Sequence, residues 1–203
     1  VDSDGKGWLM VLLPYRPNGS TAWIREETAA VYKDPMHIVI STRRHLLTVY
    51  RHGEPILRVG VALGALETPT PRGHFAIYQK ILEPAWSPLG PWALHLTAHS
   101  NVLFEYDGGP GRVAIHGARG PLFAVAGENV SHGCIRVPNP GIVDVAALAL
   151  DFLAAARVQR REEVLESSVA GVVPVVLAAL AHEEVGVGEA LELRILGKQA
   201  MPR

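Results

Sequence analysis

Short strands separated by turn signals constrain the fold of this chain more than any other feature. From residue 37 onward, runs rich in β-branched and aromatic residues read "HIVIS", "HLLTVY" and "ILRVGVAL", with the turn "RHGEP" between the last two. The runs "HFAIYQKI" (74–81) and "RVAIH" (112–116) have the same character. Many short strands with intervening turns are typical of β-sandwiches and barrels. We therefore expect a mainly β, sandwich- or barrel-like domain.

Proline and glycine mark the connections between these strands. The segment "ETPTPRG" (67–73) is predicted to be a loop, and the proline- and glycine-rich region 83–111 is predicted to hold short strands at best. Near the start, "GWLMVLLPYRPNGSTAWIREE" contains Asn18-Gly19, a strong signal for a turn between two strands. This stretch predicts a separate N-terminal hairpin.

One helix is expected after the strands. Asn139 is a candidate N-cap, and Pro140 suits the first helical turn. Apolar residues then recur on one face at helical spacing: Ile142, Val145, Ala146, Ala149, Phe152, Leu153 and Ala156. A second helix is suggested through "RREEVLESS", and "VVPVVL" (172–177) and "ALELRILG" (190–197) predict late strands.

Composition and charge limit the class of protein. The 203 residues, 48% hydrophobic and 19% charged, support one domain with a sizeable core. We assign 1–34 to a short N-terminal β segment, 35–178 to the main domain and 179–203 to a C-terminal extension without an assigned structure. A net charge of −1 argues against nucleic-acid binding.

No membrane segment or leader is predicted. The longest uncharged run near the end, "SSVAGVVPVVLAALA" (167–181), is too short to span a bilayer and contains a proline. The start, "VDSDGKGW", lacks the apolar stretch of a secretory signal, so an exported protein would correspond here to its mature form. We expect a monomer.

The single cysteine lies in "VSHGCIRVPN" (130–139). A thiol with a pKa of about 8.5 needs a neighbouring base or cation to act as a nucleophile at neutral pH. His132 precedes Cys134 by two residues, so an extended backbone would place both on one face. His116 ends the strand "RVAIH", and the following loop is long enough to return the chain beside that strand.

The neighbouring residues suit acyl chemistry. Gly117 and Gly133 allow close approach of a substrate to the backbone, and the amides of residues 133 and 134 are candidate oxyanion donors. Arg136 carries a planar group that suits a carboxylate.

The residues alone leave other interpretations open. Most lone cysteines are small core residues, and a histidine pair with a cysteine can hold zinc. Cys134 has no second cysteine nearby and the chain has no H-E-x-x-H helix, so no metal is expected. Neither of two common thiol-protease signatures, C-G-S-C-W and Q-A-C-R-G, occurs in the sequence.

Two motifs together resemble a known family. "AIHG" (114–117), a loop, and then "SHGCIRVPN" (131–139) resemble the L,D-transpeptidase catalytic domain, also called YkuD. The stretch 37–77 is similar to the opening hairpins of that domain and to its T-P-x-G-x-F/Y-x-I motif, here Thr70, Pro71, Gly73, Phe75 and Ile77. The resemblance covers about residues 37–140. The front piece is similar to the segment that precedes this domain in actinobacterial members, which suggests a remnant of an SH3-like module.

The resemblance implies a cysteine enzyme of peptidoglycan that needs no cofactor. Cys134 would be the nucleophile and His116 the proton donor and acceptor. Ser131, His132 and Gly133 would shape the site and its oxyanion hole, and Arg136 would contact substrate or brace the loop. Some members have serine or threonine after the first histidine; here Gly117 leaves only a backbone carbonyl to orient the imidazole.

The implied reaction is 3→3 cross-linking of peptidoglycan stem peptides through a thioester, with release of D-alanine. An L,D-carboxypeptidase that hydrolyses the same acyl-enzyme is the first alternative, and a non-catalytic wall-binding module is the second. Stem peptides and carbapenems are the expected partners, and the expected location is outside the cytoplasmic membrane. The family's closing Gly-x-Pro-Val strand is matched by 171–176 with one extra residue, and 178–203 matches nothing in the family pattern.

Overall fold

The protein is mainly β, as expected. The computed structural model describes residues 2–29, 31–32, 35–120, 126–149, 177–178 and 190–194. The strands are β1 (Asp2–Ser3), β2 (Trp8–Leu12), β3 (Thr21–Arg25), β4 (Val31–Tyr32), β5 (Met36–Ser41), β6 (Leu46–Arg51), β7 (Glu54–Gly60), β8 (Leu63–Gly64), β9 (Gly73–Leu82), β10 (Trp92–His99), β11 (Arg112–His116), β12 (Asn129–Ser131), β13 (Ile135–Arg136), β14 (Leu177–Ala178) and β15 (Ala190–Arg194). The described residues also contain a short 3₁₀ turn, Glu26–Thr28, and one α-helix, α1 (Asn139–Leu148).

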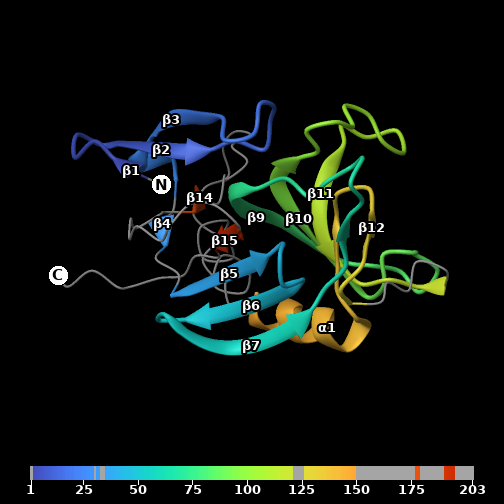
Figure 1. Ribbon diagram of the computed structural model, residues 1–203. Coiled ribbons are helices and arrows are strands. Elements are labelled where there is room, and N and C mark those ends of the chain that lie inside the picture. Colours follow the sequence, from blue (N-terminus) through green and yellow to red (C-terminus); the bar gives the residue numbers. More distant parts are fainter. Residues whose placement is uncertain are drawn as a thin grey trace.

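One large sheet organises the main domain. Its strand order is β13-β11-β10-β9-β15-β5-β6-β7, and its two halves, β9–β11 and β5–β7, run in different directions in Figure 1. Hairpin connections join β5 to β6 and β6 to β7, with His52 and Gly53 in the left-handed region at the second turn. The two halves form a sandwich-like arrangement, as predicted from the pattern of short strands.

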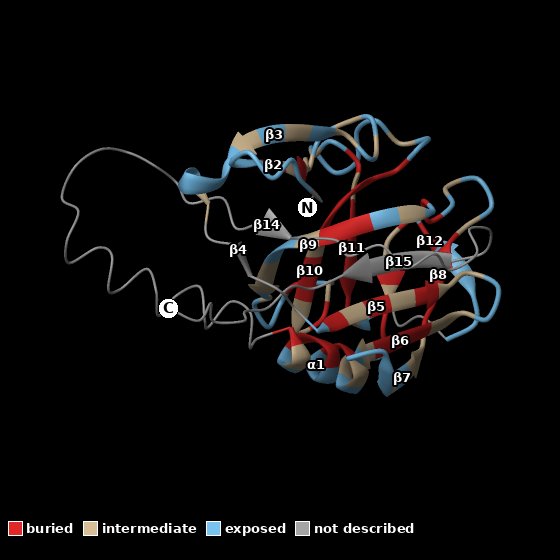
Figure 2. Cartoon of the chain, turned by 90° about the vertical axis from the view of Figure 1, so that its left-hand side faces the viewer, coloured by how far each residue is buried: buried red, intermediate tan, exposed pale blue. Residues whose placement is uncertain are grey.

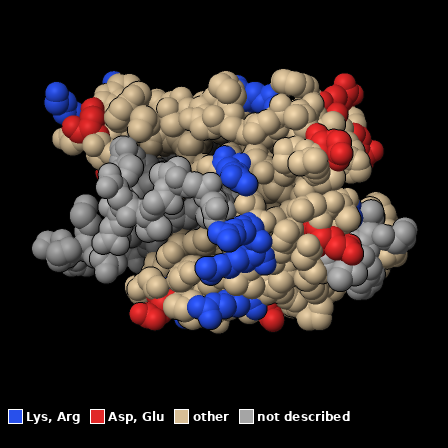
Figure 3. All heavy atoms as spheres, viewed as in Figure 1, with Lys and Arg blue, Asp and Glu red and all other residues tan. Residues whose placement is uncertain are grey.

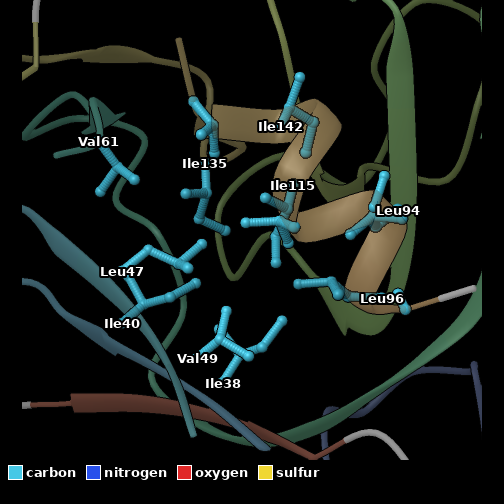
Figure 4. Packing of buried hydrophobic residues seen from close by; sticks show 14 of the residues in the cluster. Ile38, Ile40, Leu47, Val49, Val61, Leu94, Leu96, Ile115, Ile135 and Ile142 are labelled. Carbon is cyan, nitrogen blue, oxygen red and sulfur yellow. The ribbon is translucent and has the colours of Figure 1, made fainter. Parts of the chain in front are cut away.

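The core lies between the two halves of this sheet and α1. Strand β5 alternates between buried and less buried residues, as expected for a strand with one face on a core, and β6 is buried along its middle residues, Leu47–Val49. Figure 4 shows the buried side chains of both halves and of α1 meeting in one cluster, in which the following are fully buried: Ile38, Ile40, Leu47, Leu94, Leu96, Ile115, Ile135 and Ile142. Figure 2 shows the same burial along β5, β6 and β10, with exposed residues on α1's outer side.

The predicted absence of a long strand in 83–111 is wrong. Strand β10 (Trp92–His99) has eight residues, most of them buried, and pairs antiparallel with both β9 and β11. The prolines and glycines that suggested irregular structure lie on either side of it. The alternating run "WALHLTAH" is therefore a central strand bounded by breakers, at Pro91 and in the loop 100–111.

The helix begins near the expected residue but is capped differently. Pro138 occupies the N-cap position and makes no side-chain cap hydrogen bond, so the prediction that Asn139 caps α1 is wrong. The side-chain oxygen of Asn139 instead accepts the backbone N–H of Ala118, 3.0 Å away. Asn139 thus joins the helix start to the segment after His116. The predicted continuation through Phe152, Leu153 and Ala156, and the helix "RREEVLESS", lie outside the described residues.

The N-terminal hairpin forms as predicted. β2 and β3 pair antiparallel from Trp8↔Arg25 to Leu12↔Thr21, and β1 adds to β2. Leu9 and Val11 are buried in a small cluster of their own. In Figure 1 this small sheet lies above the main sheet.

The late strand predicted in 190–197 is confirmed as β15. It pairs antiparallel with β5, Leu191 opposite Ile40, and parallel with β9, Leu191 opposite Gly73. A strand from the segment assigned to a C-terminal extension therefore lies inside the main sheet. Of the predicted strand 172–177, the structure describes only β14, which pairs with β4.

Charge is distributed unevenly over the surface despite a net charge of −1. In Figure 3, Lys and Arg side chains gather over the middle of the face that carries β5–β7, whereas the acidic side chains lie toward the rim. Arg51 of β6 and Arg58 of β7 are exposed. No helix among the described residues is long and apolar enough to cross a membrane.

Truncation of Ile142 tests whether α1 belongs to the core. Ile142 is fully buried on α1, whereas the adjacent Val143 is 44% exposed. Because Ile142→Ala leaves a cavity, we expect it to lower the free energy of unfolding by about 2–5 kcal/mol in urea titrations. Val143→Ala is the matched control and should change it by less than about 1 kcal/mol. Equal effects of the two variants would contradict this packing of α1.

Candidate active site

A short parallel pairing brings the two sequence motifs together. Strands β11 and β13 pair with Ile115 opposite Ile135 and His116 opposite Arg136. Both isoleucines are fully buried in the core. Since neighbouring side chains along a strand point to opposite faces, His116 and Arg136 face away from that core. Cys134 lies two residues before Arg136, next to Ala114.

The Cys134 thiol is half-buried and held neutral at rest. Burial raises its pKa above the ordinary value, while a backbone hydrogen bond from Ala114 and the charge of Arg136 act in the opposite direction. Burial is the largest of these effects, so the thiol form predominates at neutral pH. A nucleophilic role therefore requires a base that removes the proton as the sulfur attacks.

His116 has the protonation state of such a base. It is buried at the end of β11, and its Nδ1 lies 2.5 Å from the carbonyl oxygen of Gly117. A carbonyl only accepts hydrogen bonds, so Nδ1 carries the proton and Nε2 keeps its lone pair. Burial lowers the pKa of His116 to about 4; the Gly117 hydrogen bond opposes this, and the charges of Arg136 and His95 add to it. The imidazole is neutral at pH 7.

Gly117 orients this imidazole, as the sequence predicted, and the site has room for no side chain there. A Cβ on Gly117 would lie 2.5 Å from Oδ1 of Asn139, 2.9 Å from Pro91 and 3.1 Å from Ile142. The N–H of Gly117 donates to the carbonyl of Trp92, 3.2 Å away. The turn after His116 is thus packed directly against the start of α1.

Ser131 holds the cysteine loop together. Its buried hydroxyl donates to the carbonyl oxygen of Cys134 (2.6 Å) and accepts the N–H of Gly133 (3.1 Å). Its own carbonyl oxygen accepts the N–H of Ala65 (2.8 Å) and the hydroxyl of Thr68 (3.0 Å). The cysteine loop is therefore hydrogen-bonded to the segment that follows β8. Strand β8 itself pairs with β12.

The Gly133 amide is engaged within the loop. The Gly133 N–H donates to the Ser131 hydroxyl. Of the two oxyanion donors predicted from sequence, the amides of residues 133 and 134, this leaves the Cys134 amide. Gly133 has φ +115°, a backbone conformation that residues other than glycine rarely adopt.

His132 does not share a face with Cys134 in the way predicted. The prediction assumed an extended backbone, and the positive φ of Gly133 breaks the alternation of side chains. His132 is exposed, and its Nδ1 lies 3.2 Å from the hydroxyl of Tyr106, with the two rings 4.8 Å apart. Its contact is with the loop before β11.

Arg136 supplies a positive charge beside the thiol and the imidazole. Its backbone N–H and carbonyl exchange hydrogen bonds with Ala62, each 2.9 Å long. The backbone of Arg136 is thus held between β11 on one side and Ala62 on the other. Its Nε is buried and has no hydrogen-bond partner among the described residues. An anion would satisfy this group, which fits the carboxylate role predicted for Arg136.

Several residues of the site were not predicted from sequence. Ala62, Ala65 and Thr68 brace the cysteine loop, and Tyr106 contacts His132. Ala62, Ala65 and Thr68 lie far from the motifs along the chain, and Tyr106 lies in the loop before "AIHG"; no local spacing marks any of them. Within the described ranges, no group of three or more His, Cys, Asp or Glu side chains is placed to hold a metal ion.

The model of the YkuD family, the L,D-transpeptidase catalytic domain, matches residues 35–169, more than half of the chain. This chain belongs to the YkuD family. The matched range contains both motifs of the site.

Curated relatives in the YkuD family are distant. A Bacillus subtilis protein named as the L,D-transpeptidase YkuD is 29% identical over 117 residues, which cover 58% of this chain and 62% of the relative. A Bacillus licheniformis protein of the same name is 28% identical over 114 residues, 56% of this chain and 60% of the relative. The chain thus spans about three fifths of the length of these relatives.

Solved structures of the same class are similar to parts of this YkuD-family chain. An L,D-transpeptidase from Mycobacterium smegmatis is 21% identical, with a TM-score of 0.44, 74% of this chain and 75% of that chain covered. The LD transpeptidase LdtMt1, solved in complex with imipenem, is 27% identical, with a TM-score of 0.40, 58% of this chain and 54% of that chain covered.

Removal of the Ser131 hydroxyl should loosen the cysteine loop. In Ser131→Ala the Gly133 amide and the Cys134 carbonyl lose their partner, so the sulfur is held less precisely. We expect the second-order rate of Cys134 acylation to fall roughly ten- to hundredfold. Ser41→Ala is the control, since among the described residues that hydroxyl accepts only the N–H of Arg44 in an exposed turn. An unchanged rate in Ser131→Ala would contradict this role of Ser131.

The low pKa of His116 predicts how stability depends on pH. The unfolded histidine binds a proton near pH 6.5, whereas the folded one does so near pH 4. The neutral form therefore stabilises the fold above about pH 6.5, and this contribution is lost as the pH falls toward 4. The shift corresponds to roughly 3 kcal/mol.

His116→Gln should accordingly weaken the fall in the free energy of unfolding between pH 6.5 and 4, measured by urea titration at each pH. The exposed His132→Gln is the control for the loss of an imidazole outside the buried site. If His116→Gln retained the full dependence, the burial of a neutral imidazole would be contradicted.

Proposed function

We propose that this YkuD-family domain is a peptidoglycan L,D-transpeptidase that forms 3→3 cross-links through a thioester on Cys134. The observation that carries the proposal is the site itself. A neutral imidazole whose Nδ1 is bonded to Gly117 ends β11, and a neutral thiol directly precedes β13, the strand paired with β11. Beside them lies Arg136, an arginine without an acidic partner among the described residues. Membership of the family supports the class of reaction.

The first half of the reaction forms the acyl-enzyme. Nε2 of His116 takes the thiol proton as the sulfur of Cys134 attacks the carbonyl carbon of the third stem residue, at its L-centre. The Cys134 N–H is the amide that we assign to the developing oxyanion, because the Gly133 amide is already engaged. When the carbon–nitrogen bond breaks, His116 returns its proton to the leaving amine, and D-alanine departs.

The second half transfers the acyl group. The side-chain amine of a second stem attacks the thioester, and His116 removes a proton from this amine. The carbon–sulfur bond then breaks, an amide bond links the two stems, and the proton on His116 restores the thiol. The hydrogen bond from Nδ1 to Gly117 keeps Nε2 directed for both transfers.

Arg136 is the residue that we assign to a substrate carboxylate. A stem tetrapeptide ends in the free carboxylate of D-alanine, and the buried Nε of Arg136 is unsatisfied among the described residues. The charge of Arg136 also lowers the pKa of both Cys134 and His116. We place the reaction outside the cytoplasmic membrane, where its proposed substrate lies.

A purified disaccharide tetrapeptide tests the proposal. The unaltered protein should give a cross-linked dimer and free D-alanine by mass spectrometry, and Cys134→Ala should give neither. His116→Gln should lower the rate by roughly a hundredfold or more, because the general base is lost. A tripeptide without dimer would show hydrolysis in place of transfer, and dimer formation by Cys134→Ala would refute the proposed nucleophile.

Intact mass after exposure to a carbapenem provides a second readout, because its strained amide is a mimic of the acyl donor. We expect one adduct on the unaltered protein and none on Cys134→Ala. Absence of both the adduct and any product from the tetrapeptide would favour a non-catalytic wall-binding module.

A further inference from the structure

The turn of the N-terminal hairpin contacts the loop that precedes β11. Asn18 lies at the tip of the hairpin, and its side chain pairs with both backbone groups of His99: Nδ2 donates to the carbonyl (2.7 Å) and Oδ1 accepts the N–H (2.8 Å). Nδ2 also lies 3.1 Å from Oδ1 of Asn101. The amide side chain of Asn18 thus pairs with the N–H and carbonyl of His99, as the backbone of a neighbouring strand would.

Arg16 holds both ends of the same loop. Its guanidinium donates to the carbonyl oxygens of Ser100 (2.6 Å), Leu103 (2.7 Å) and Pro110 (3.2 Å). Its charged carbon also lies 4.7 Å from the centre of the Phe104 ring. Three carbonyls from residues 100–110 therefore converge on one side chain, and the two terminal nitrogens of its planar guanidinium share them.

The loop 100–111 reaches the cysteine loop at its other end. The Ser100 hydroxyl accepts the N–H groups of Val102 and Leu103, and Tyr106 and Gly109 exchange backbone hydrogen bonds in a tight turn. From this turn the Tyr106 hydroxyl meets Nδ1 of His132, two residues before Cys134. Phe104 and Tyr106 are 72% and 49% exposed, so the loop presents two aromatic rings to solvent beside the site.

We propose that Arg16 and Asn18 are positioning residues of the active site. They hold the loop 100–111, and this loop sets the position of Tyr106 and His132 at the approach to Cys134. The N-terminal hairpin is then part of the substrate-binding unit, and it controls how an acyl donor reaches the thiol. This inference rests on the proposed function only for the identity of the donor.

The partners of the Arg16 and Asn18 hydrogen bonds indicate that these residues position the loop 100–111 and do more than attach the hairpin to the main domain. The three hydrogen bonds of Arg16 all go to carbonyls of residues 100–110, a segment outside the strands. Asn18 bonds to His99, the last residue of β10, and to Asn101, so it holds the point where the loop leaves that strand. In Figure 1 the hairpin and the upper ends of β10 and β11 lie on the same side of the molecule.

Asn18→Ala and Arg16→Lys test the inference in the full chain. Arg16→Lys keeps the charge but has one donor nitrogen in place of the two, Nη1 and Nη2, with which Arg16 spans these carbonyls. Ser20→Ala is the matched control because, among the described residues, its hydroxyl donates only to Pro17 within the same turn. Thermal unfolding first establishes that each variant folds. We expect the second-order rate of acylation by a carbapenem to fall roughly tenfold in Asn18→Ala and Arg16→Lys, and to be unchanged in Ser20→Ala.

Two further readouts separate positioning from general loosening. Alkylation of Cys134 by iodoacetamide, a probe too small to need the loop, should keep its rate in both variants. The NMR signal of the His132 ring should shift in the same direction as in Tyr106→Phe, which removes the hydroxyl contact directly, and should not shift in Ser20→Ala.

Each outcome decides one question. A His132 signal and an acylation rate equal to those of Ser20→Ala would overturn the inference while leaving the proposed function standing. A shifted His132 signal in a protein that forms no acyl-enzyme would leave the coupling standing and refute the proposed function. Equal losses in carbapenem acylation and iodoacetamide alkylation would show general loosening and would also overturn the inference.

Discussion

The chemistry of this domain depends on two residue pairs between β11 and β13. With Ile115 and Ile135 both fully buried, their neighbours His116 and Arg136 must face the other way, and Cys134 comes to lie beside Ala114. The core thus sets the direction of the reacting groups. The same burial keeps the thiol and the imidazole neutral, because a charge on either would be poorly solvated there. In this structure the proton therefore stays on the sulfur.

Much of this was accessible from sequence. Alternating apolar residues and turn signals predict the hairpins of β5–β7 and of the N-terminus, because strand period and turn chemistry are local properties. The resemblance of "AIHG" and "SHGC" to the family motifs indicates His116 and Cys134 as the reacting pair, which stays a prediction. The glycine at 117 leaves only a carbonyl to orient the ring, and His116 Nδ1 does bond to that carbonyl. These features depend on residues that are close along the chain or on one strand pair.

What the sequence could not show depends on distant contacts. Strand β10 was hidden by its flanking prolines and glycines, although its interior alternates as a strand should. Asn139 carries every local sign of a helix cap, but its oxygen serves the Ala118 amide, because the turn after His116 packs against the helix. Likewise Asn18 signals only a tight turn, and nothing nearby in the sequence indicates that its side chain bonds to His99.

The place of β15 has a consequence for how the chain folds. Leu191 pairs with Ile40 on one side and with Gly73 on the other, so the two halves of the main sheet are hydrogen-bonded through a strand that comes long after both. During synthesis, β5 and β9 are made early, and the backbone groups that pair with β15 stay unpaired until that strand is made. Such long-range closure is slow, since the entropy of a long loop must be overcome before the strand is held. The sheet that orients the thiol is thus completed late, after His116 and Cys134 have already been synthesised.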